Sequence, residues 1–489
     1  MQNSSDQTSQ TLALTSKTRS ELFDYVQGTI EYYTKAVASM RVAPELNQTI
    51  LDALRAAIAN FNFNVPRTPI DAARFAVSGL ISQQVHTPHP RYFGLFNPAP
   101  SAMGIVADTL VATFNPQMAA WSHSPFAAEI ELHLLRSFGE KFGYKPDETD
   151  GTFTSGGAEA NHTALLTALI HKFPEYSECG LLGCQKQPVV YVSAQAHHSF
   201  VKAARFCGLG TNSVRSIPTD DSLKMSVDML REQIRLDLAQ NLVPTMLVAT
   251  AGATSSGAID PISELEEIAR KEEMWFHVDA AWGGAAALVP ELAGLVQGMG
   301  KADSITFDAH KFLSVPMGAG MYITRHKEIL QKTCGISTAY MPLDAEGLDV
   351  TDPFVHSMQW SRRFIGLKVF LTLAVTGWEG YAATICHQTA MGNLLRSELQ
   401  SAGWQIVNDT PLPVVCFVDA THENGSTPEF LKAVAKRIVQ GGSAWLSTTL
   451  LNGATVLRAC ITNYGTQERD VQALVRHLRD AAQEIADKN

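Results

Sequence analysis

The chain has 489 residues, with 38 Lys and Arg against 48 Asp and Glu, so its formal net charge at pH 7 is −10. Hydrophobic residues make up 45% and charged residues 18%, which excludes a disordered chain and indicates a well-packed globular protein of two or three domains. The acidic balance argues against binding to nucleic acid or to anionic membranes. No uninterrupted apolar stretch reaches the roughly 18 residues that a spanning helix needs, so we expect no membrane segment.

The N-terminus and the cysteines both favour a cytoplasmic location. Residues Met1–Gln10 are rich in Ser, Gln and Thr and lack a basic start and an apolar core, so we predict no secretory signal. The seven cysteines, from Cys179 to Cys460, include no C-x-x-C pair, and no histidine cluster completes a zinc set with them. We therefore expect reduced thiols and no metal site.

The first part of the chain is predicted to be mainly helical. Thr18–Met40 and Pro44–Phe61 have helical patterns, and Phe126–Phe142 places its large apolar residues on one face. The segment His86–Pro100 holds four prolines and is expected to be irregular and extended.

Between about residues 150 and 325, short apolar runs alternate with helix-like segments. The predicted strands are Val189–Ser193, Thr245–Thr250, Trp275–Asp279, Ser304–Asp308 and Ala319–Thr324. The predicted helices are Glu159–Lys172, Ser199–Cys207, Ser226–Gln240 and Ile262–Glu273. This alternation predicts an α/β fold with a mainly parallel sheet covered on both faces.

After about Lys368 the pattern changes to long helices with a few strands. The predicted strands are Pro413–Val418 and Val456–Thr462, and Gln467–Ala486 is predicted to be the last helix. We expect a smaller C-terminal α+β domain here.

Five polar segments follow predicted strands or begin predicted helices, so all should meet at one edge of one sheet. They are Thr154–Asn161, Ser193–Ser199, Ala251–Gly257, Trp275–Ala281 and Ser304–Lys311. Each one alone has a more ordinary explanation: a helix cap, a Gly/Ser turn, a core histidine or a surface lysine. Together they offer an anion cradle, an imidazole, a hydroxyl, a carboxylate and an amine. Pyridoxal 5′-phosphate needs such a set, because its phosphate, ring nitrogen and aldehyde each require a partner.

The motifs TSGGAEAN, AQAHHS, HVDAAWGG and ADSITFDAHK resemble those of the group II pyridoxal-phosphate decarboxylases, which include aromatic-L-amino-acid, histidine and glutamate decarboxylases. The order of the motifs and the 32-residue separation of Asp279 and Lys311 both fit this family. The resemblance implies fold type I of aspartate aminotransferase, with a seven-stranded sheet. It also implies an N-terminal helical segment over residues 1–100, a large cofactor domain over 101–372 and a small domain over 373–489.

The resemblance also implies roles for single residues. Lys311 would bind the cofactor's aldehyde, Asp279 would pair with the ring nitrogen, and His197 would stack on the ring. The remaining cofactor contacts would be Thr254, Ala281, Gly157, Ala158, His310 and Asp308. Tyr340 matches a loop tyrosine that protonates the substrate carbon, while the substrate-binding residues would be Arg458, Phe96 and Leu95.

Three positions near the cofactor depart from the family pattern: Ala194, Asp308 and Ala309 stand where an acidic residue, an asparagine and a proline are common. Three more, Thr87, Leu95 and Ala119, stand where family members that act on aromatic substrates usually have aromatic residues. The expected reaction is decarboxylation of an L-amino acid, with an aromatic substrate favoured. Decarboxylation of glutamate, aspartate or 2,4-diaminobutyrate stays open, as does an aminotransferase, a lyase or a catalytically inactive regulatory homologue. The resemblance further implies a homodimer with active sites at the interface and with the N-terminal helices packed on the partner.

Overall fold

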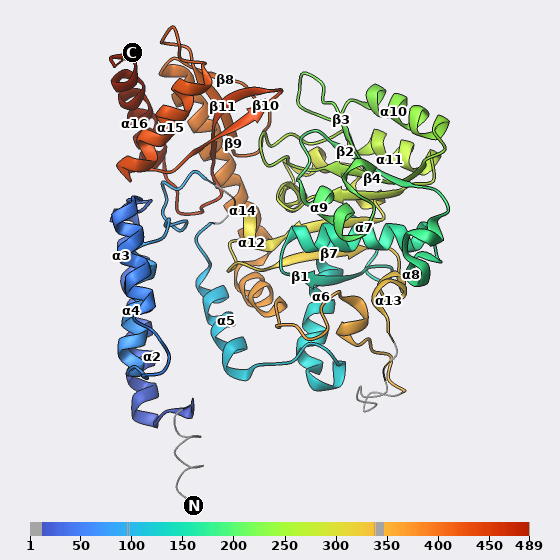
Figure 1. Cartoon of the computed structure of the whole chain (residues 1–489), viewed down its shortest axis with the longest axis horizontal. Coiled ribbons are helices and arrows are strands. Elements are labelled where there is room, and N and C mark those ends of the chain that lie inside the picture. Colours follow the sequence, from blue (N-terminus) through green and yellow to red (C-terminus); the bar gives the residue numbers. More distant parts are fainter. Residues whose placement is uncertain (1–11, 95, 97, 337, 339–346, 489) are drawn as a thin grey trace, which may run out of the picture.

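The computed structural model describes residues 12–94, 96, 98–336, 338 and 347–488 (Figure 1). Two β-sheets organise these residues, one with seven strands and one with four. The larger sheet has the strand order β1-β7-β6-β5-β4-β2-β3. Its strands are β1 (Asp150–Thr154), β2 (Pro188–Ser193), β3 (Val214–Ile217), β4 (Val243–Thr250), β5 (Trp275–Asp279), β6 (Ser304–Asp308) and β7 (Gly320–Thr324).

Most neighbouring strands of the larger sheet are parallel, and β7 is the exception. It pairs antiparallel with β6, where Ser304 lies opposite Thr324, and antiparallel with β1, where Asp150 lies opposite the same Thr324. Because β1 and β6 are both antiparallel to β7, they run in the same direction. The carboxyl ends of β1, β2, β4, β5 and β6 therefore lie at one edge, as the sequence predicted.

Helices cover both faces of this sheet, because successive side chains of its strands point in opposite directions. Val190 and Val192 of β2 pack on the side of α7 (Gly157–Lys172) and α9 (Ser199–Phe206). Their neighbour Val189 packs on the opposite side. That side is covered by α6 (Pro125–Lys141), α10 (Val227–Ala239) and α11 (Ile262–Lys271). The short helices α8 (Tyr176–Cys179), α12 (Ala309–Phe312) and α13 (Ile329–Cys334) complete this part of the chain.

The N-terminal helices form a column along one side of the molecule (Figure 1). They are α2 (Ser16–Ala36), α3 (Gln48–Ala59) and α4 (Pro69–Ser82), and none of the three buries a residue. Their large apolar side chains face outward: Phe23 is 61% exposed, Ile58 53% and Leu80 59%. Helix α5 (Ala102–Phe114) follows and exposes Phe114 as well.

The C-terminal part has its own core around the antiparallel sheet β10-β11-β9-β8. Its elements are β8 (Trp404–Ile406), β9 (Val414–Asp419), α15 (Pro428–Gly441), β10 (Ser447–Leu451), β11 (Ala454–Cys460) and α16 (Glu468–Ala486). Helix α14 (Gly366–Ser401) leads into it and crosses the expected boundary at 372/373. The helix is bent at Gly377, whose φ is 67°.

Helix α14 is also the one helix among the described residues that could cross a membrane by length and composition alone. The sequence expectation had included no such segment. Two polar residues on this helix, Lys368 and Gln388, are buried and hydrogen-bonded to Met317 O and Thr462 O. These two hydrogen bonds join α14 to other parts of the folded chain.

The structure confirms the predicted fold and corrects several details. Strands β5 and β6 have the predicted bounds, whereas β1, β3, β8 and β10 were not predicted, nor were α4, α5 and α15. The first predicted helix ends earlier than Met40, at Ala36, and continues as a single 3₁₀ turn. The second begins at Gln48, because Asn47 caps it by accepting the amide of Ile50 at 2.9 Å.

Candidate active site

A cavity of about 100 Å³ opens at the carboxyl edge of the larger sheet, where the sequence placed the five polar segments. Eight predicted residues line it: Gly157, Ala158, His197, Thr254, Asp279, Ala281, Asp308 and Lys311. Four others were not named as individual site residues, namely Asn161, Thr250, Gly252 and Trp282, although Asn161 and Gly252 lie within two of the predicted polar segments. The cavity thus brings together side chains that lie up to 154 residues apart in the chain.

Lys311 reaches this cavity from α12, the single helical turn that follows β6. Its Nζ forms an ion pair with Oδ2 of Asp308 at 3.0 Å, and Asp308 is only 2% exposed. The other carboxylate oxygen, Oδ1, is buried and has no hydrogen-bond partner among the described residues. Since a buried acceptor without a partner is costly, this oxygen marks a place where a ligand or water would be bound.

Gly157 begins α7 and leaves room that no other residue would leave. A Cβ at this position would lie 2.9 Å from Oδ2 of Asp308 and 3.3 Å from Cβ of Ala281. The amides of Gly157 and Ala158 are the first two of α7, and such amides have no partner within the helix. They lie at the positive end of this 16-residue helix. Such an end binds phosphate well.

Asp279 ends β5 and is held at both of its oxygens. Oδ2 accepts the side-chain amide of Asn161 at 2.8 Å, and Oδ1 accepts the backbone amide of Ala281 at 3.2 Å. Asp279 is 6% exposed, and it is paired with donors rather than with another charged side chain.

Two of the predicted histidines differ in their relation to the cavity. His197 lines it, and Nδ1 of His197 accepts the amide of Ser199 at 3.3 Å. His310 lies just behind, where its Nδ1 accepts the amide of Ala319 and its Nε2 lies 3.9 Å from Oδ2 of Asp308. Burial lowers the pKa of both imidazoles, although the carboxylates near them oppose the shift. Both rings are therefore favoured in the neutral form.

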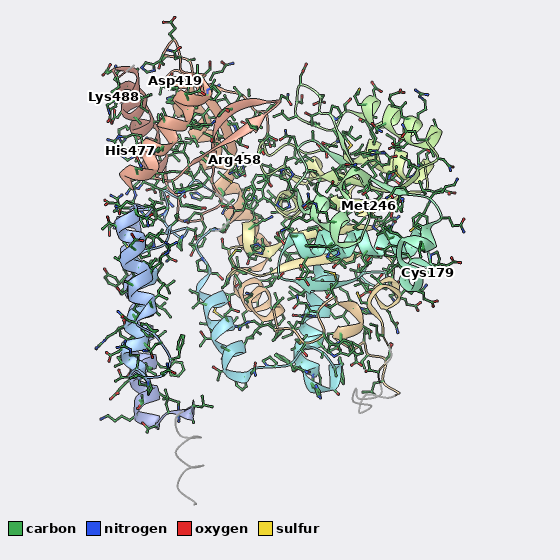
Figure 2. The ribbon with its side chains drawn as sticks, viewed as in Figure 1. Cys179, Met246, Asp419, Arg458, His477 and Lys488 are labelled. Atoms are coloured by element: carbon green, nitrogen blue, oxygen red, sulfur yellow. The ribbon has the colours of Figure 1, made fainter. Side chains whose placement is uncertain are left out.

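Arg458 enters the same region from β11 of the smaller sheet (Figure 2). It is 3% exposed; its Nε donates to Thr254 O at 2.8 Å, and its Nη2 is buried without a partner among the described residues. The guanidinium lies 5.1 Å from the centre of the Phe96 ring, and Lys311 Nζ lies 5.8 Å from the same centre. Phe96 in turn stacks on Trp282, with ring centres 4.5 Å apart.

Two predicted site residues, Leu95 and Tyr340, lie outside the described residues. The other predicted site residues either line the cavity or contact a residue that does. Of the residues that were missed, Asn161 carried a signal in the sequence, because it is a polar side chain within the apolar helical run that follows the Gly-Gly turn.

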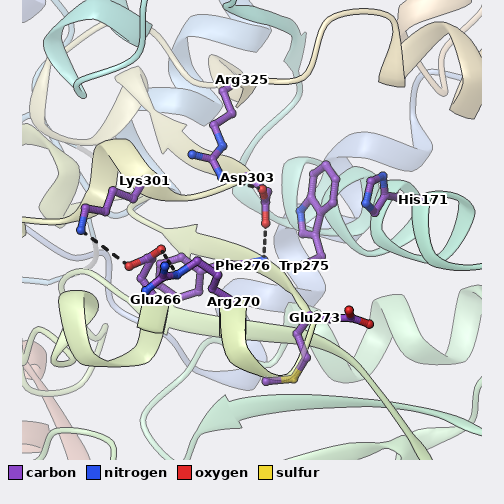
Figure 3. A pocket seen from close by; sticks show the side chains of 10 residues that line it. His171, Glu266, Arg270, Glu273, Trp275, Phe276, Lys301, Asp303 and Arg325 are labelled. Atoms are coloured by element: carbon purple, nitrogen blue, oxygen red, sulfur yellow. Dashed lines mark hydrogen bonds and ion pairs between the residues drawn. The ribbon is translucent and has the colours of Figure 1, made fainter. Parts of the chain in front are cut away.

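A second cavity, of about 260 Å³, lies at the opposite edge of the sheet, where β5 and β6 begin (Figure 3). Its cations are paired: Lys301 with Glu266 at 3.7 Å, and Arg325 with Asp303 at 3.1 Å. It shares no lining residue with the first cavity.

The geometry of the first cavity fits pyridoxal 5′-phosphate. The open amides of α7 suit the phosphate, Asp279 suits a protonated ring nitrogen, and Lys311 suits the aldehyde. A fold of this kind with such a site defines a pyridoxal-phosphate-dependent enzyme.

The comparisons with known proteins narrow this class. Residues 68–419 match the family described as "Pyridoxal-dependent decarboxylase conserved domain". The aromatic-L-amino-acid decarboxylase of Bacillus atrophaeus is 31% identical over 424 residues, 86% of each chain. The acidic amino acid decarboxylase GADL1 of Mus musculus is 30% identical and covers 75% of this chain and 68% of its own.

Among solved structures, Oryza sativa TDC with PLP and tryptamine superposes with a TM-score of 0.88 at 26% identity, covering 97% of this chain and 99% of that one. The chain belongs to the pyridoxal-dependent decarboxylase family. It is a carboxy-lyase that acts on an amino acid and uses pyridoxal 5′-phosphate as its cofactor.

Proposed function

We propose that this enzyme converts an aromatic L-amino acid to the corresponding amine and CO₂. The observation that carries the proposal is the stacked pair Phe96–Trp282, which places an aromatic ring 5.8 Å from Lys311 Nζ. Aromatic side chains of a substrate gain from such a surface through burial and ring contacts. The similarity to an aromatic-L-amino-acid decarboxylase supports the same choice.

A second candidate is an acidic amino acid. The buried Nη2 of Arg458 has no partner among the described residues, and a guanidinium binds carboxylates well. One carboxylate is common to all amino acids, whereas glutamate and aspartate bring a second. The similarity to an acidic amino acid decarboxylase supports this alternative.

The chain's own residues would share the work as follows. The bound cofactor supplies an electron-withdrawing ring conjugated to the substrate nitrogen, which accepts the electron pair released when CO₂ leaves. Lys311 would hold the cofactor until the amino group of the substrate takes the place of the lysine. Asp279 would keep a proton on the ring nitrogen. His197 would cover the ring and exclude water, and Arg458 would fix the carboxylate so that the correct bond breaks.

Protonation of the substrate carbon would fall to Tyr340. With Tyr340→Phe, CO₂ release should persist, but amine formation should fall below CO₂ release, because the substrate carbon would have lost its proton donor. Formation of amine at the normal rate by Tyr340→Phe would contradict this role.

Screening all common L-amino acids for CO₂ and amine release would test the choice of substrate. We expect phenylalanine, tyrosine, tryptophan or a hydroxylated relative to give the highest kcat/KM. A higher value for glutamate or aspartate would favour the second candidate. Lys311→Ala, which should lose the visible absorption of the bound cofactor, is the control for background release.

We also propose that the enzyme is a cytoplasmic homodimer with active sites at the interface, and that residues 1–100, 101–372 and 373–489 act as its three structural units. Support comes from the outward apolar faces of α2, α3 and α4, which suit a second subunit, and from the seven free cysteines. Light scattering should give twice the chain mass of 53.1 kDa. A monomer at micromolar concentration would contradict the dimer.

A further inference from the structure

A chain of buried hydrogen bonds runs inside the larger sheet and ends on Asp279. The indole Nε1–H of Trp275 donates to Ser304 Oγ at 2.8 Å, and the same Oγ lies 2.8 Å from Nδ1 of His277. Nε2 of His277 lies 3.2 Å from Oδ1 of Asn161, whose Nδ2 donates to Oδ2 of Asp279 at 2.8 Å. None of the five residues is more than 6% exposed.

The proton positions in this chain follow from its two ends. A carboxylate that pairs with a protonated ring nitrogen only accepts, so the NH₂ group of Asn161 must face Asp279 and its carbonyl oxygen must face His277. His277 must then donate from Nε2. Burial lowers the pKa of His277 to about 3, so the ring is neutral and Nδ1 accepts. The hydroxyl of Ser304 donates its hydrogen to Nδ1 of His277, and its oxygen accepts the indole N–H of Trp275.

We propose that Asn161 and His277 are positioning residues that hold Asp279 in the orientation needed by the cofactor's ring nitrogen. This inference rests on the proposed pairing of Asp279 with that nitrogen. The amides of Asn161 and Ala281 each hold one oxygen of Asp279, so the carboxylate plane cannot rotate. His277 in turn prevents the Asn161 amide from flipping, because a flipped amide would face its N–H toward the N–H of the imidazole.

The first test replaces Asn161 by leucine, which has a similar size and no donor. We expect the Kd for pyridoxal 5′-phosphate, measured by fluorescence titration of the apo protein, to rise about 10- to 100-fold, because a hydrogen bond to a charged group is lost. The visible absorption of the bound cofactor should also become dependent on pH within the neutral range, since Asp279 would no longer hold the ring proton in place.

The second test, Asn161→Asp, separates positioning from mere packing. A protonated carboxyl at position 161 can donate to Asp279, whereas an ionised one repels it. The Kd of this variant should approach that of the wild type at acidic pH and rise relative to it as the pH increases. The titratable groups that face this position are Asp279, His277, His197, Asp308 and Lys311, and all are present in both proteins.

The matched control is Thr163→Val on the same helix. Thr163 is 1% exposed, but its hydroxyl donates to Glu159 O and does not reach the cavity. The Kd of Thr163→Val for pyridoxal 5′-phosphate should stay within about twofold of the wild-type value. If Asn161→Leu does not fold, the pH dependence of Asn161→Asp decides alone.

Equal Kd values for Asn161→Leu and Thr163→Val would overturn the inference. So would a ratio of the Asn161→Asp Kd to the wild-type Kd that does not change with pH. Either result, with a wild type that binds cofactor and releases CO₂, would leave the proposed function intact. A wild type that releases no CO₂ from any amino acid would refute the proposed function instead.

Discussion

Replacement of Arg458 by methionine should separate substrate binding from stability. The guanidinium is 3% exposed and its Nη2 has no partner among the described residues. If that group binds the substrate carboxylate, the variant loses a charge-assisted hydrogen bond of about 1.5–3 kcal/mol, which lowers kcat/KM about 10- to 150-fold.

The stability of the same variant should change little. Thr254 O loses its donor, which costs about 1–3 kcal/mol, but an incompletely paired buried charge is removed as well. Methionine has a similar length and keeps the contact with the Phe96 ring. We therefore expect a thermal midpoint within a few degrees of the wild type.

The assay compares the substrate with the product amine, which lacks the carboxylate. Arg458→Met should raise the KM of the amino acid while the Ki of the amine stays constant. Arg396→Met is the matched control, because the Arg396 guanidinium donates to the carbonyl oxygens of Thr410, Leu412 and Val414 outside the cavity. It should lower the melting temperature and leave kcat/KM nearly unchanged. An equal loss of affinity for amine and amino acid in Arg458→Met would refute the reasoning.

Three further predictions concern the cofactor and the buried histidine. Lys311→Ala should abolish CO₂ release and the visible band of the purified enzyme; a variant that keeps a stable visible band would argue against its role. Gly157→Val should weaken cofactor binding at least tenfold, because the added Cβ would lie 2.9 Å from Asp308 Oδ2, and equilibrium dialysis measures this. In the folded protein the pKa of His277 is about 3, below the usual 6.5. The stability that neutral His277 contributes is therefore complete above pH 6.5. It is lost as the pH falls toward 3, by about 5 kcal/mol in all. Melting temperatures of His277→Gln should therefore fall less steeply with acid than those of the wild type, and parallel curves would contradict the assignment.

The elements that could be predicted from the sequence are those with a continuous apolar pattern. β5 and β6 are fully buried and read as unbroken strands. β1 was missed although it is equally buried, because its sequence Asp-Gly-Thr-Phe-Thr contains one large apolar residue. The antiparallel direction of β7 could not be seen either, since a strand's direction depends on how the chain crosses the sheet and not on its composition.

The site shows the same division. Residues that belong to a recognisable motif, such as Lys311 and Asp279, were predicted, and the structure brings them to one cavity. Trp282 was not predicted, because a large aromatic residue is normally a core residue and only its stacking on Phe96 reveals its place. Arg458 was expected in the site only from the family resemblance. It lies on β11 of the smaller sheet, and nothing in the sequence around it indicates its contact with Thr254 O.

The outward apolar faces of α2, α3 and α4 affect how the protein behaves on dilution. Helices without a fully buried residue gain less from tertiary packing, which normally supplies most helical stability. Association with another copy would supply the missing burial, so by mass action the melting temperature should increase with protein concentration. Limited proteolysis should accordingly cut this region first in dilute samples.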